Sequence, residues 1–413
     1  MKVLWLVNLT LPEPSRALGF GNNPVGGWLI GQREQLKKSV SLVICSIDAR
    51  LKQPQFLSLD GVEYAVLPTG SEQEFAQLLQ KTKPDLVHLW GSENPAAPAL
   101  VAQFAPERIL LSAQGIMTPY TEHLLDGVPE KYCHSSFLQK MATIIDRGEL
   151  LDRELDFYKE QSKKEAALLA NLRHVTGRTP WDQAELAKLA PHAAYYVCNE
   201  TLRPGFFAAR WEHGPQKPVL FLSQGNHPRK GLHWLLQALP PVLEKYPDLT
   251  VHIAGWPMVK KGPLPEPILR LLLPYQTYLK KLIHELHLQK QVVWLGCLNE
   301  TDMRAALLQS SIFVMPSSLE NSPNSLGEAM LLGMPCIATD AGGTAGMLTN
   351  GKEGLLYEPE DVPALTRAIL TLLDDPALAK RYGDAARQRA LITHDPVRNG
   401  QAMLEIYHKI LEG

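Results

Sequence analysis

The stretch Ile312–Asp340, IFVMPSSLENSPNSLGEAMLLGMPCIATD, predicts a strand–loop–helix–strand unit. Residues 312–315 form a short apolar run of the length expected for a buried strand, and Pro316 ends it. After a polar loop, a helical segment runs to Gly333, a residue suited to ending a helix. Residues 336–339 read as the next strand. Units of this kind build parallel sheets, so the stretch indicates an α/β protein.

The start of this helix has the features of an anion-binding site. Ser322 is placed to cap the helix, and Pro323 suits its first position. The backbone N–H groups of Asn324, Ser325 and Leu326 should then lie near the helix N-terminus. Such groups have no partner within the helix and favour an anion such as a phosphate.

Two glutamates flank this helix start. Glu320 lies in the loop and Glu328 in the second helical turn. A carboxylate can accept hydrogen bonds from both hydroxyls of a vicinal diol such as ribose. Either glutamate alone could simply be a solvated loop residue or a side chain that suits the helix dipole. Together with the anion site, however, they suggest a nucleoside diphosphate ligand.

Length and composition set limits on the function. The 413 residues suggest about two or three domains, and the net charge of -2 gives no sign of nucleic-acid binding. No apolar run approaches the roughly 20 residues of a membrane-spanning helix. Residues 1–14 could be mistaken for a secretion signal, but Lys2–Leu9 reads as a first buried strand. The cysteines lack a CxxC pair, which favours a reducing compartment and no metal cluster; they are Cys45, Cys133, Cys198, Cys297 and Cys336.

The N-terminal half alternates apolar runs with helical patterns, which predicts a doubly wound domain over residues 1–212. A glycine-rich loop ends at Gly26 and Gly27, where a ligand could approach the start of a helix closely. An ordinary strand–helix loop is the alternative. Gln114 follows the strand at 109–112, and the carboxyl ends of strands are where such sheets bind ligands.

A second strand series predicts another doubly wound domain over residues 213–396, followed by an amphipathic helix over 397–413. In this half, Arg229 and Lys230 precede a helix that starts near residue 232. Cations at a helix N-terminus are unfavourable by roughly 0.3–1 kcal/mol each, and a bound anion would reverse the sign. The pair therefore suggests a phosphate site, with simple surface exposure as the alternative.

The sequence resembles a known enzyme family at these positions. Glu320-x7-Glu328, with Pro323-Asn324-Ser325 inside it, resembles the signature of retaining nucleotide-sugar transferases of the GT-B fold, family 4 or group 1 of the glycosyltransferases. The resemblance implies that Glu320 contacts the donor sugar, that Glu328 contacts the ribose, and that the intervening amides, including that of Leu326, hold the phosphates and the sugar.

The resemblance also implies a fold and exposes departures from the pattern. GT-B proteins have two doubly wound Rossmann-like domains facing a central cleft, and a C-terminal helix that crosses back to the first domain. Lys230-Gly231 matches the family, whereas Asn226 stands in place of the usual Arg, a role that Arg229 could take. Gln114 stands where many members carry His.

These features lead to a functional hypothesis. The chain is expected to move a sugar from a UDP- or GDP-linked donor to a saccharide or lipid-linked acceptor, with retention of configuration and with no metal or other cofactor. Glu320, Arg229, Lys230 and Gln114 would be catalytic, with the acceptor in the first domain and the donor in the second. The alternatives are a nucleotide-sugar epimerase, a non-catalytic nucleotide-binding protein and a two-lobed protein that binds a small ligand. A cytoplasmic location, with peripheral contact to the cell membrane, is expected from the resemblance alone.

Overall fold

The computed structural model describes residues 1–21, 26–70, 72–94, 96–134, 150–255 and 274–413. The chain forms two compact units. Unit 1 contains Met1–Thr118, Gln161–Pro204 and Ile392–Gly413, and unit 2 contains Pro119–Glu160 and Gly205–Leu391. This division differs from the expected one, because residues 119–160 belong to unit 2 and because the later crossings fall at 204/205 and 391/392 instead of 212/213 and 396/397.

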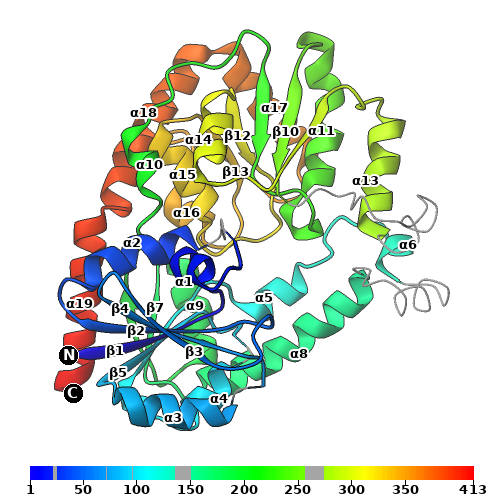
Figure 1. The fold of residues 1–413 in the computed structure, drawn as a ribbon. Coiled ribbons are helices and arrows are strands. Elements are labelled where there is room, and N and C mark those ends of the chain that lie inside the picture. Colours follow the sequence, from blue (N-terminus) through cyan, green and yellow to red (C-terminus); the bar gives the residue numbers. More distant parts are fainter. Residues whose placement is uncertain (22–25, 71, 95, 135–149, 256–273) are drawn as a thin grey trace. The chain divides into compact units, whose positions relative to one another are not determined.

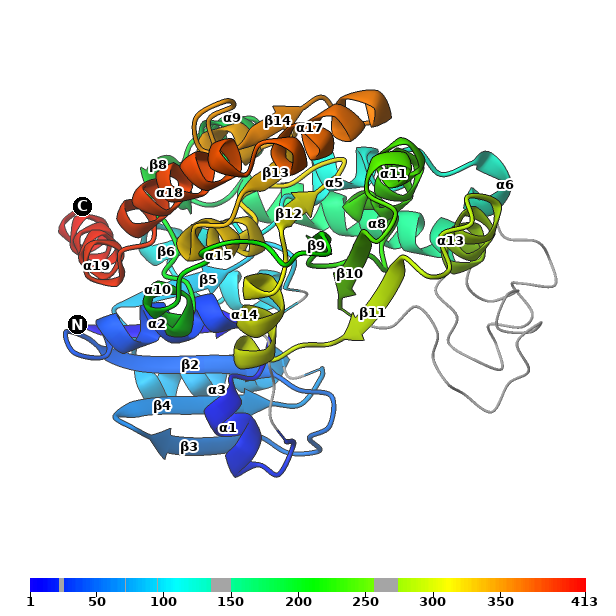
Figure 2. The same ribbon diagram turned by 90° about the horizontal axis from the view of Figure 1, so that it is seen from above.

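Unit 1 is built on a sheet with eight strands among the described residues, in the order β3-β4-β2-β1-β5-β6-β7-β8. All neighbouring pairs are parallel except β3 and β4, which form an antiparallel hairpin that the sequence did not predict. Figure 2 shows β2, β4 and β3 side by side at this edge. The strands are β1 (Lys2–Val7), β2 (Ser41–Ile47), β3 (Gln55–Leu59), β4 (Val62–Leu67), β5 (Leu86–Trp90), β6 (Ile109–Ser112), β7 (His174–Gly177) and β8 (Ala194–Val197).

Helices cover this sheet and include the last helix of the chain. The C-terminal helix α19 packs against α2, and Figure 1 shows it in red beside that helix. The expected return of this helix to the N-terminal domain is therefore confirmed. The helices of this unit are α1 (Pro12–Ala17), α2 (Gly27–Leu36), α3 (Glu72–Thr82), α4 (Ala97–Val101), η1 (Pro106–Arg108), α9 (Pro180–Leu189) and α19 (Pro396–Glu412).

A buried hydrogen-bond chain fastens α19 to the sheet. The Tyr407 hydroxyl accepts a hydrogen bond from Trp5 Nε1 at 2.9 Å and lies 2.7 Å from His88 Nδ1. His88 Nε2 lies 2.7 Å from Ser112 Oγ on β6. Burial lowers the pKa of His88 to about 3, so the ring is neutral and one nitrogen accepts. Met403 of the same helix is buried beside Tyr407, so α19 completes the core of unit 1.

Unit 2 contains a parallel sheet with six strands among the described residues, in the order β11-β10-β9-β12-β13-β14. Parallel strands covered on both faces are typical of doubly wound domains, which confirms the expected fold class. The strands are β9 (Val219–Leu222), β10 (Thr250–Ala254), β11 (Val292–Gly296), β12 (Ile312–Met315), β13 (Cys336–Thr339) and β14 (Leu355–Tyr357). The helices are α6 (Glu130–Cys133), α10 (Pro204–Ala208), η2 (Pro228–Lys230), α11 (Leu232–Lys245), α13 (Pro274–Glu285), α14 (Glu300–Leu308), α15 (Asn324–Leu332), α16 (Thr344–Met347), α17 (Val362–Asp374) and α18 (Pro376–Thr393).

The segment Pro119–Glu160 packs on unit 2, although it lies in the N-terminal half of the sequence. The Tyr132 ring contacts Tyr278 of α13 with a centroid distance of 5.2 Å. Ser318 Oγ, which follows β12, donates to the carbonyl of His123 at 3.0 Å. Two helices connect this segment to unit 1, namely α5 (Met117–Glu122) and α8 (Leu151–Leu169). α8 thus runs from unit 2 into unit 1.

None of the described helices has the length and hydrophobicity needed to span a bilayer.

Candidate active site

The loops after β9 and β12 meet at the point where the strand order of unit 2 reverses. β9 lies between β10 and β12. The strands that follow β9 in the sequence, β10 and β11, lie on one side of it, and β12, β13 and β14 lie on the other. Doubly wound sheets bind ligands outside the carboxyl ends of the strands at this switch point. The β9 loop carries Arg229 and Lys230, and the β12 loop carries Glu320. The topology therefore brings together three residues that the sequence predicted to be catalytic.

Lys230 and the buried carboxylate of Glu320 form an ion pair at this point. Lys230 Nζ lies 2.6 Å from Glu320 Oε1, and the Glu320 side chain is only 6% exposed. Burial alone would raise the pKa of Glu320, but the positive charges of Lys230 and Arg229 outweigh it and hold that pKa below its ordinary value. Burial lowers the pKa of Lys230, and Arg229 adds to this effect while Glu320 opposes it. The carboxylate is therefore ionised at neutral pH.

Arg229 supplies a second cation. Its guanidinium donates to the carbonyl of Leu319 at 2.8 Å, lies 3.7 Å from Glu320 Oε2, and stacks 4.1 Å from the ring centroid of Tyr120. Arg229 Nε is buried without a hydrogen-bond partner. The alternative of simple surface exposure is wrong, since Arg229 and Lys230 are 11% and 19% exposed at their side chains. Two cations and one carboxylate leave one net positive charge, which suits an anionic ligand.

Two glycines allow these loops to approach each other closely. Gly231 has φ +68°, and a Cβ there would lie 1.8 Å from the carbonyl oxygen of Pro316. Gly342 has φ +62°, and a Cβ there would lie 2.1 Å from the carbonyl oxygen of Glu320, which accepts from the N–H of Gly343 at 2.8 Å. Any other residue at Gly231 or Gly342 would push the loops apart. Both glycines therefore help to fix the position of Glu320.

The start of α15 differs in detail from the expectation. Pro323 is the N-cap residue rather than the first helical residue, and no side chain caps the helix. Ser322 Oγ instead contacts Met347 Sδ at 3.5 Å, so the predicted cap is wrong. The N–H of Leu326 donates to the carbonyl of Pro323 at 3.1 Å and is already satisfied. A ligand anion at this helix start would therefore rely on Asn324 and Ser325.

Glu328 lies within α15 and is 6% exposed. Gly333 ends the helix with φ +79°, as the sequence predicted. The site residues predicted in unit 2 thus come from two neighbouring loops and one helix. The roles assigned to Glu320, Glu328 and the amides stay predictions.

Gln114 follows β6 in unit 1, at the strand end where it was expected. Its Nε2 donates to Glu200 Oε1 at 2.6 Å, and Arg178 NH1 lies 2.9 Å from the same oxygen. The sequence did not single out Glu200, because the residue follows β8 at a distance of 86 positions from Gln114. The contact fixes the direction of the Gln114 amide group. A single carboxylate therefore holds both Gln114 and Arg178.

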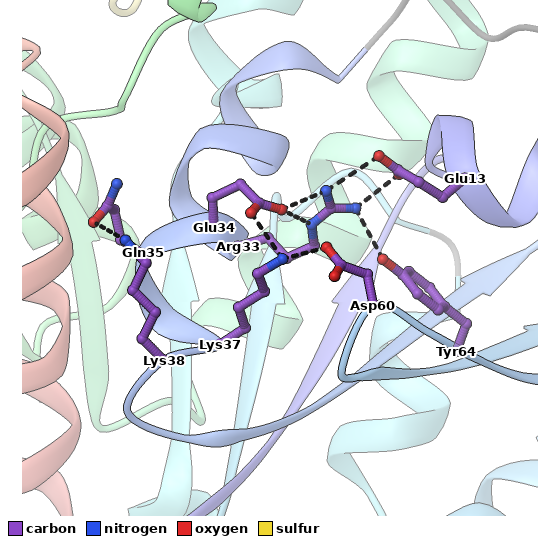
Figure 3. A network of polar contacts seen from close by, with 8 residues as sticks. All are labelled: Glu13, Arg33, Glu34, Gln35, Lys37, Lys38, Asp60 and Tyr64. Carbon is purple, nitrogen blue, oxygen red and sulfur yellow. Dashed lines mark hydrogen bonds and ion pairs between the residues drawn. The ribbon is translucent and has the colours of Figure 1, made fainter.

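Packing within unit 1 accounts for Gly26 and Gly27. A Cβ on Gly27 would lie 2.3 Å from the Arg203 side chain, and one on Gly26 would lie 2.8 Å from Leu9. Arg33 of the following helix lies in a polar network, drawn in Figure 3, where it pairs with Glu13 of α1 at 2.7 Å and donates to the Tyr64 hydroxyl at 2.9 Å. This network ties α1, α2 and β4 together. Ligand binding by the two glycines stays a prediction.

Unit 1 holds a further carboxylate, Glu93, that the sequence did not indicate. Glu93 follows β5, and Asn8, which follows the neighbouring β1, donates to it at 3.0 Å. Burial raises the pKa of Glu93 to about 7, with a further contribution from the charge of Glu165. The second oxygen of Glu93 is buried without a partner. These two strands flank the switch point of the unit 1 sheet, so Glu93 lies where such a sheet binds ligands.

A family comparison agrees with the geometry of unit 2. The sequence model of the family "Glycosyl transferases group 1" matches residues 207–389, which hold Arg229, Lys230, Glu320 and Glu328. Residues 207–389 belong to the group 1 glycosyltransferases. The glycogen synthase of Mycobacterium tuberculosis is 28% identical to this chain over 212 residues, which is 50% of the chain and 47% of that protein. The chain thus spans about half the length of the curated relatives it matches.

Solved structures extend the likeness to both units. Sucrose-phosphate synthase from Thermosynechococcus elongatus has a TM-score of 0.74 at 16% identity, with 100% of each chain covered. HepE from Anabaena in complex with UDP has a TM-score of 0.64 at 17% identity, covering 99% of this chain and 100% of its own. At these identities the likeness concerns the fold, which is GT-B. The fold expected from the sequence is confirmed.

Proposed function

We propose that this protein is a retaining glycosyltransferase that moves a sugar from a UDP- or GDP-linked donor to a hydroxyl of a saccharide or lipid-linked acceptor. The observation that carries the proposal is the convergence of Arg229 and Lys230 on Glu320 at the switch point of the group 1 domain. UDP bound to HepE, a protein of the same fold, supports a nucleotide donor. Acceptor binding is assigned to unit 1 and donor binding to unit 2.

In this proposal the diphosphate lies between the α15 N-terminus and the two cations. The N–H groups of Asn324 and Ser325 and the charges of Arg229 and Lys230 would stabilise the negative charge that develops on the leaving phosphate. The free N–H of Arg229 Nε is one donor available for this purpose. Glu320, held by Lys230, would accept a hydrogen bond from the donor sugar, and Glu328 would accept both ribose hydroxyls.

Retention follows in this scheme from attack of the acceptor hydroxyl on the face that the diphosphate leaves. The departing phosphate oxygen would take the acceptor proton, so no protein base is required. Gln114, which cannot act as a base, would then position a hydroxyl. Glu200 holds its amide group in place for this role.

The test is a screen of UDP- and GDP-sugars by thermal shift, followed by assay of nucleotide release with and without saccharide acceptors. We expect one nucleotide sugar to raise the melting temperature and to release its nucleotide faster when an acceptor is present. Conversion of the donor sugar without an acceptor would indicate an epimerase. Binding without any turnover would indicate a non-catalytic protein, and both outcomes would contradict the proposal.

Turnover should survive removal of divalent metal. Arg229 and Lys230 would supply the positive charge that a metal–diphosphate complex supplies elsewhere. The measurement is the release of nucleotide from the preferred donor in excess EDTA, compared with the same assay in Mg²⁺ or Mn²⁺. Loss of activity in EDTA and its recovery on adding metal would show that the cations of the β9 loop do not suffice.

A further inference from the structure

A cavity lies in unit 2, beside the loop that carries Arg229. Its volume is about 170 Å³. One wall comes from α8, whose first residues belong to the segment Pro119–Glu160 of unit 2. The other walls come from the β9 loop and from the start of α13. The lining residues are Leu151, Glu154, Asn226, His227, Pro228, Tyr275 and Gln276.

Two hydrogen-bond acceptors line this cavity, Asn226 Oδ1 and the Glu154 carboxylate. Asn226 Oδ1 is buried without a partner, which is a costly state unless a ligand donor reaches it. Glu154 accepts one hydrogen bond, from His227 Nε2 at 2.8 Å, and a carboxylate can accept several. A ligand rich in O–H groups could donate to both acceptors, and the side-chain amides of Asn226 and Gln276 can donate to such a ligand.

The protonation state of His227 follows from its two contacts. Its Nδ1 accepts from the backbone N–H of Arg229 at 3.2 Å, so the proton lies on Nε2 and is donated to Glu154. The ring is thus neutral, and the pair carries one negative charge from Glu154. An anionic ligand is disfavoured here, in contrast to the switch point, where the net charge is positive.

The remaining walls suit the carbon face of a sugar ring. Leu151, Pro228 and the Tyr275 ring contribute apolar surface. The Tyr275 hydroxyl bonds to His233 Nδ1 at 3.0 Å, which holds the ring in place. These side chains supply the apolar part of a lining that is mostly polar, a mixture that suits a hydroxylated ring. We propose that this cavity binds a sugar residue of the saccharide acceptor through Asn226 Oδ1 and the Glu154 carboxylate.

This inference rests on the proposed function, since it names a subsite for the acceptor of that reaction. The proposed function assigns acceptor binding to unit 1, and this subsite extends it to unit 2, where Leu151 and Glu154 lie. The link from His227 to the N–H of Arg229 connects the cavity to the loop that holds Lys230. A sugar bound here would therefore lie next to the donor-site loop.

The experiment is saturation-transfer NMR with methyl glycosides of glucose, mannose, galactose and N-acetylglucosamine, on the full chain with and without saturating UDP or GDP. We expect at least one glycoside to bind, and to remain bound when nucleotide is present. Glu154→Gln and Asn226→Leu should each weaken that binding about tenfold or more. Glu160→Gln, the same substitution on an exposed position of α8, is the matched control and should bind as the wild type does.

Nucleotide titration separates this inference from the proposed function. Glu154→Gln should keep the wild-type nucleotide affinity and melting temperature, which shows that its fold and donor site are intact. Absence of glycoside binding with normal nucleotide binding would overturn the subsite and leave the transferase proposal standing. Glycoside binding that is equal in wild type, Glu154→Gln and Asn226→Leu, or that nucleotide displaces, would also overturn it.

Discussion

Replacing Lys230 by Met should destabilise unit 2 by about 3 kcal/mol and abolish donor turnover. The substitution leaves the buried carboxylate of Glu320 with only Arg229, whose nearest nitrogen is 3.7 Å away. Removing one partner of a buried ion pair costs about 3–5 kcal/mol of stability. Because Arg229 still faces Glu320, we expect a cost at the lower end of this range. Chemical denaturation measures the change in the free energy of unfolding, and nucleotide release measures the loss of activity.

The stability lost in Lys230→Met should depend on pH. In the wild type the pKa of Glu320 is depressed, so its contribution to stability is present above pH about 4.5 and is lost as the pH falls through the folded-state pKa. In Lys230→Met, burial should raise that pKa, and mild acid should relieve the cost by protonation. The stability gap between the two proteins should therefore narrow as the pH falls from about 7 to 4.

A double variant serves as the control. Lys230→Met combined with Glu320→Gln removes the unpaired charge, and it should recover most of the stability but none of the activity. A gap that is independent of pH, or a double variant as unstable as the single one, would mean that the ion pair is not what Lys230 contributes.

Removing the last helix should have an even larger effect. Deletion of Val397–Gly413 strips Met403, Tyr407 and Ile410 from the core of unit 1. Each buried side chain of this size contributes about 1.5–3 kcal/mol to stability. The sum approaches the free energy of unfolding of a whole domain, which is about 5–15 kcal/mol. We expect the shortened chain to be insoluble or to lack the cooperative unfolding of unit 1.

Tyr407→Phe gives a graded version of the same test. It keeps the ring but leaves Trp5 Nε1 and His88 Nδ1 without their partner, at about 1–3 kcal/mol for each orphaned group. The melting temperature should fall by several degrees, whereas Val397→Ala, on an exposed position of the helix, should change it little. If Tyr407→Phe melts like the wild type, the hydrogen-bond chain does not hold the helix.

Local patterns in the sequence predicted the elements of the candidate site well. Residues 312–315 and 336–339 are strands with those bounds, because apolar runs between loop residues carry that information directly. Gly333 ends α15 because a left-handed residue is needed there. The helix start was predicted less well: Ser322 has a capping side chain, but the chain enters the helix one residue later, with Pro323 as the N-cap.

The contacts that assemble the site could not be predicted in the same way. Lys230 and Glu320 are 90 positions apart, and only the strand order brings them together. Arg229 and Lys230 were expected to face a phosphate, whereas the carboxylate of Glu320 from another loop lies beside both cations. The docking of residues 119–160 on unit 2 was missed because an amphipathic pattern identifies a buried face but not the surface that covers it.

The central claim is that the group 1 domain binds a ribonucleotide through Glu328, and titration calorimetry tests it most directly. Wild type and Glu328→Ala would each be titrated with the preferred nucleotide and its 2′-deoxy analogue. Glu328→Ala should lose about tenfold or more in affinity for the ribonucleotide, since hydrogen bonds to a charged group contribute about 1.5–3 kcal/mol each. The helix should survive, because Ala favours it. The deoxy analogue should bind weakly to the wild type and lose little further in the variant. Equal affinity of both proteins for the ribonucleotide would contradict the account.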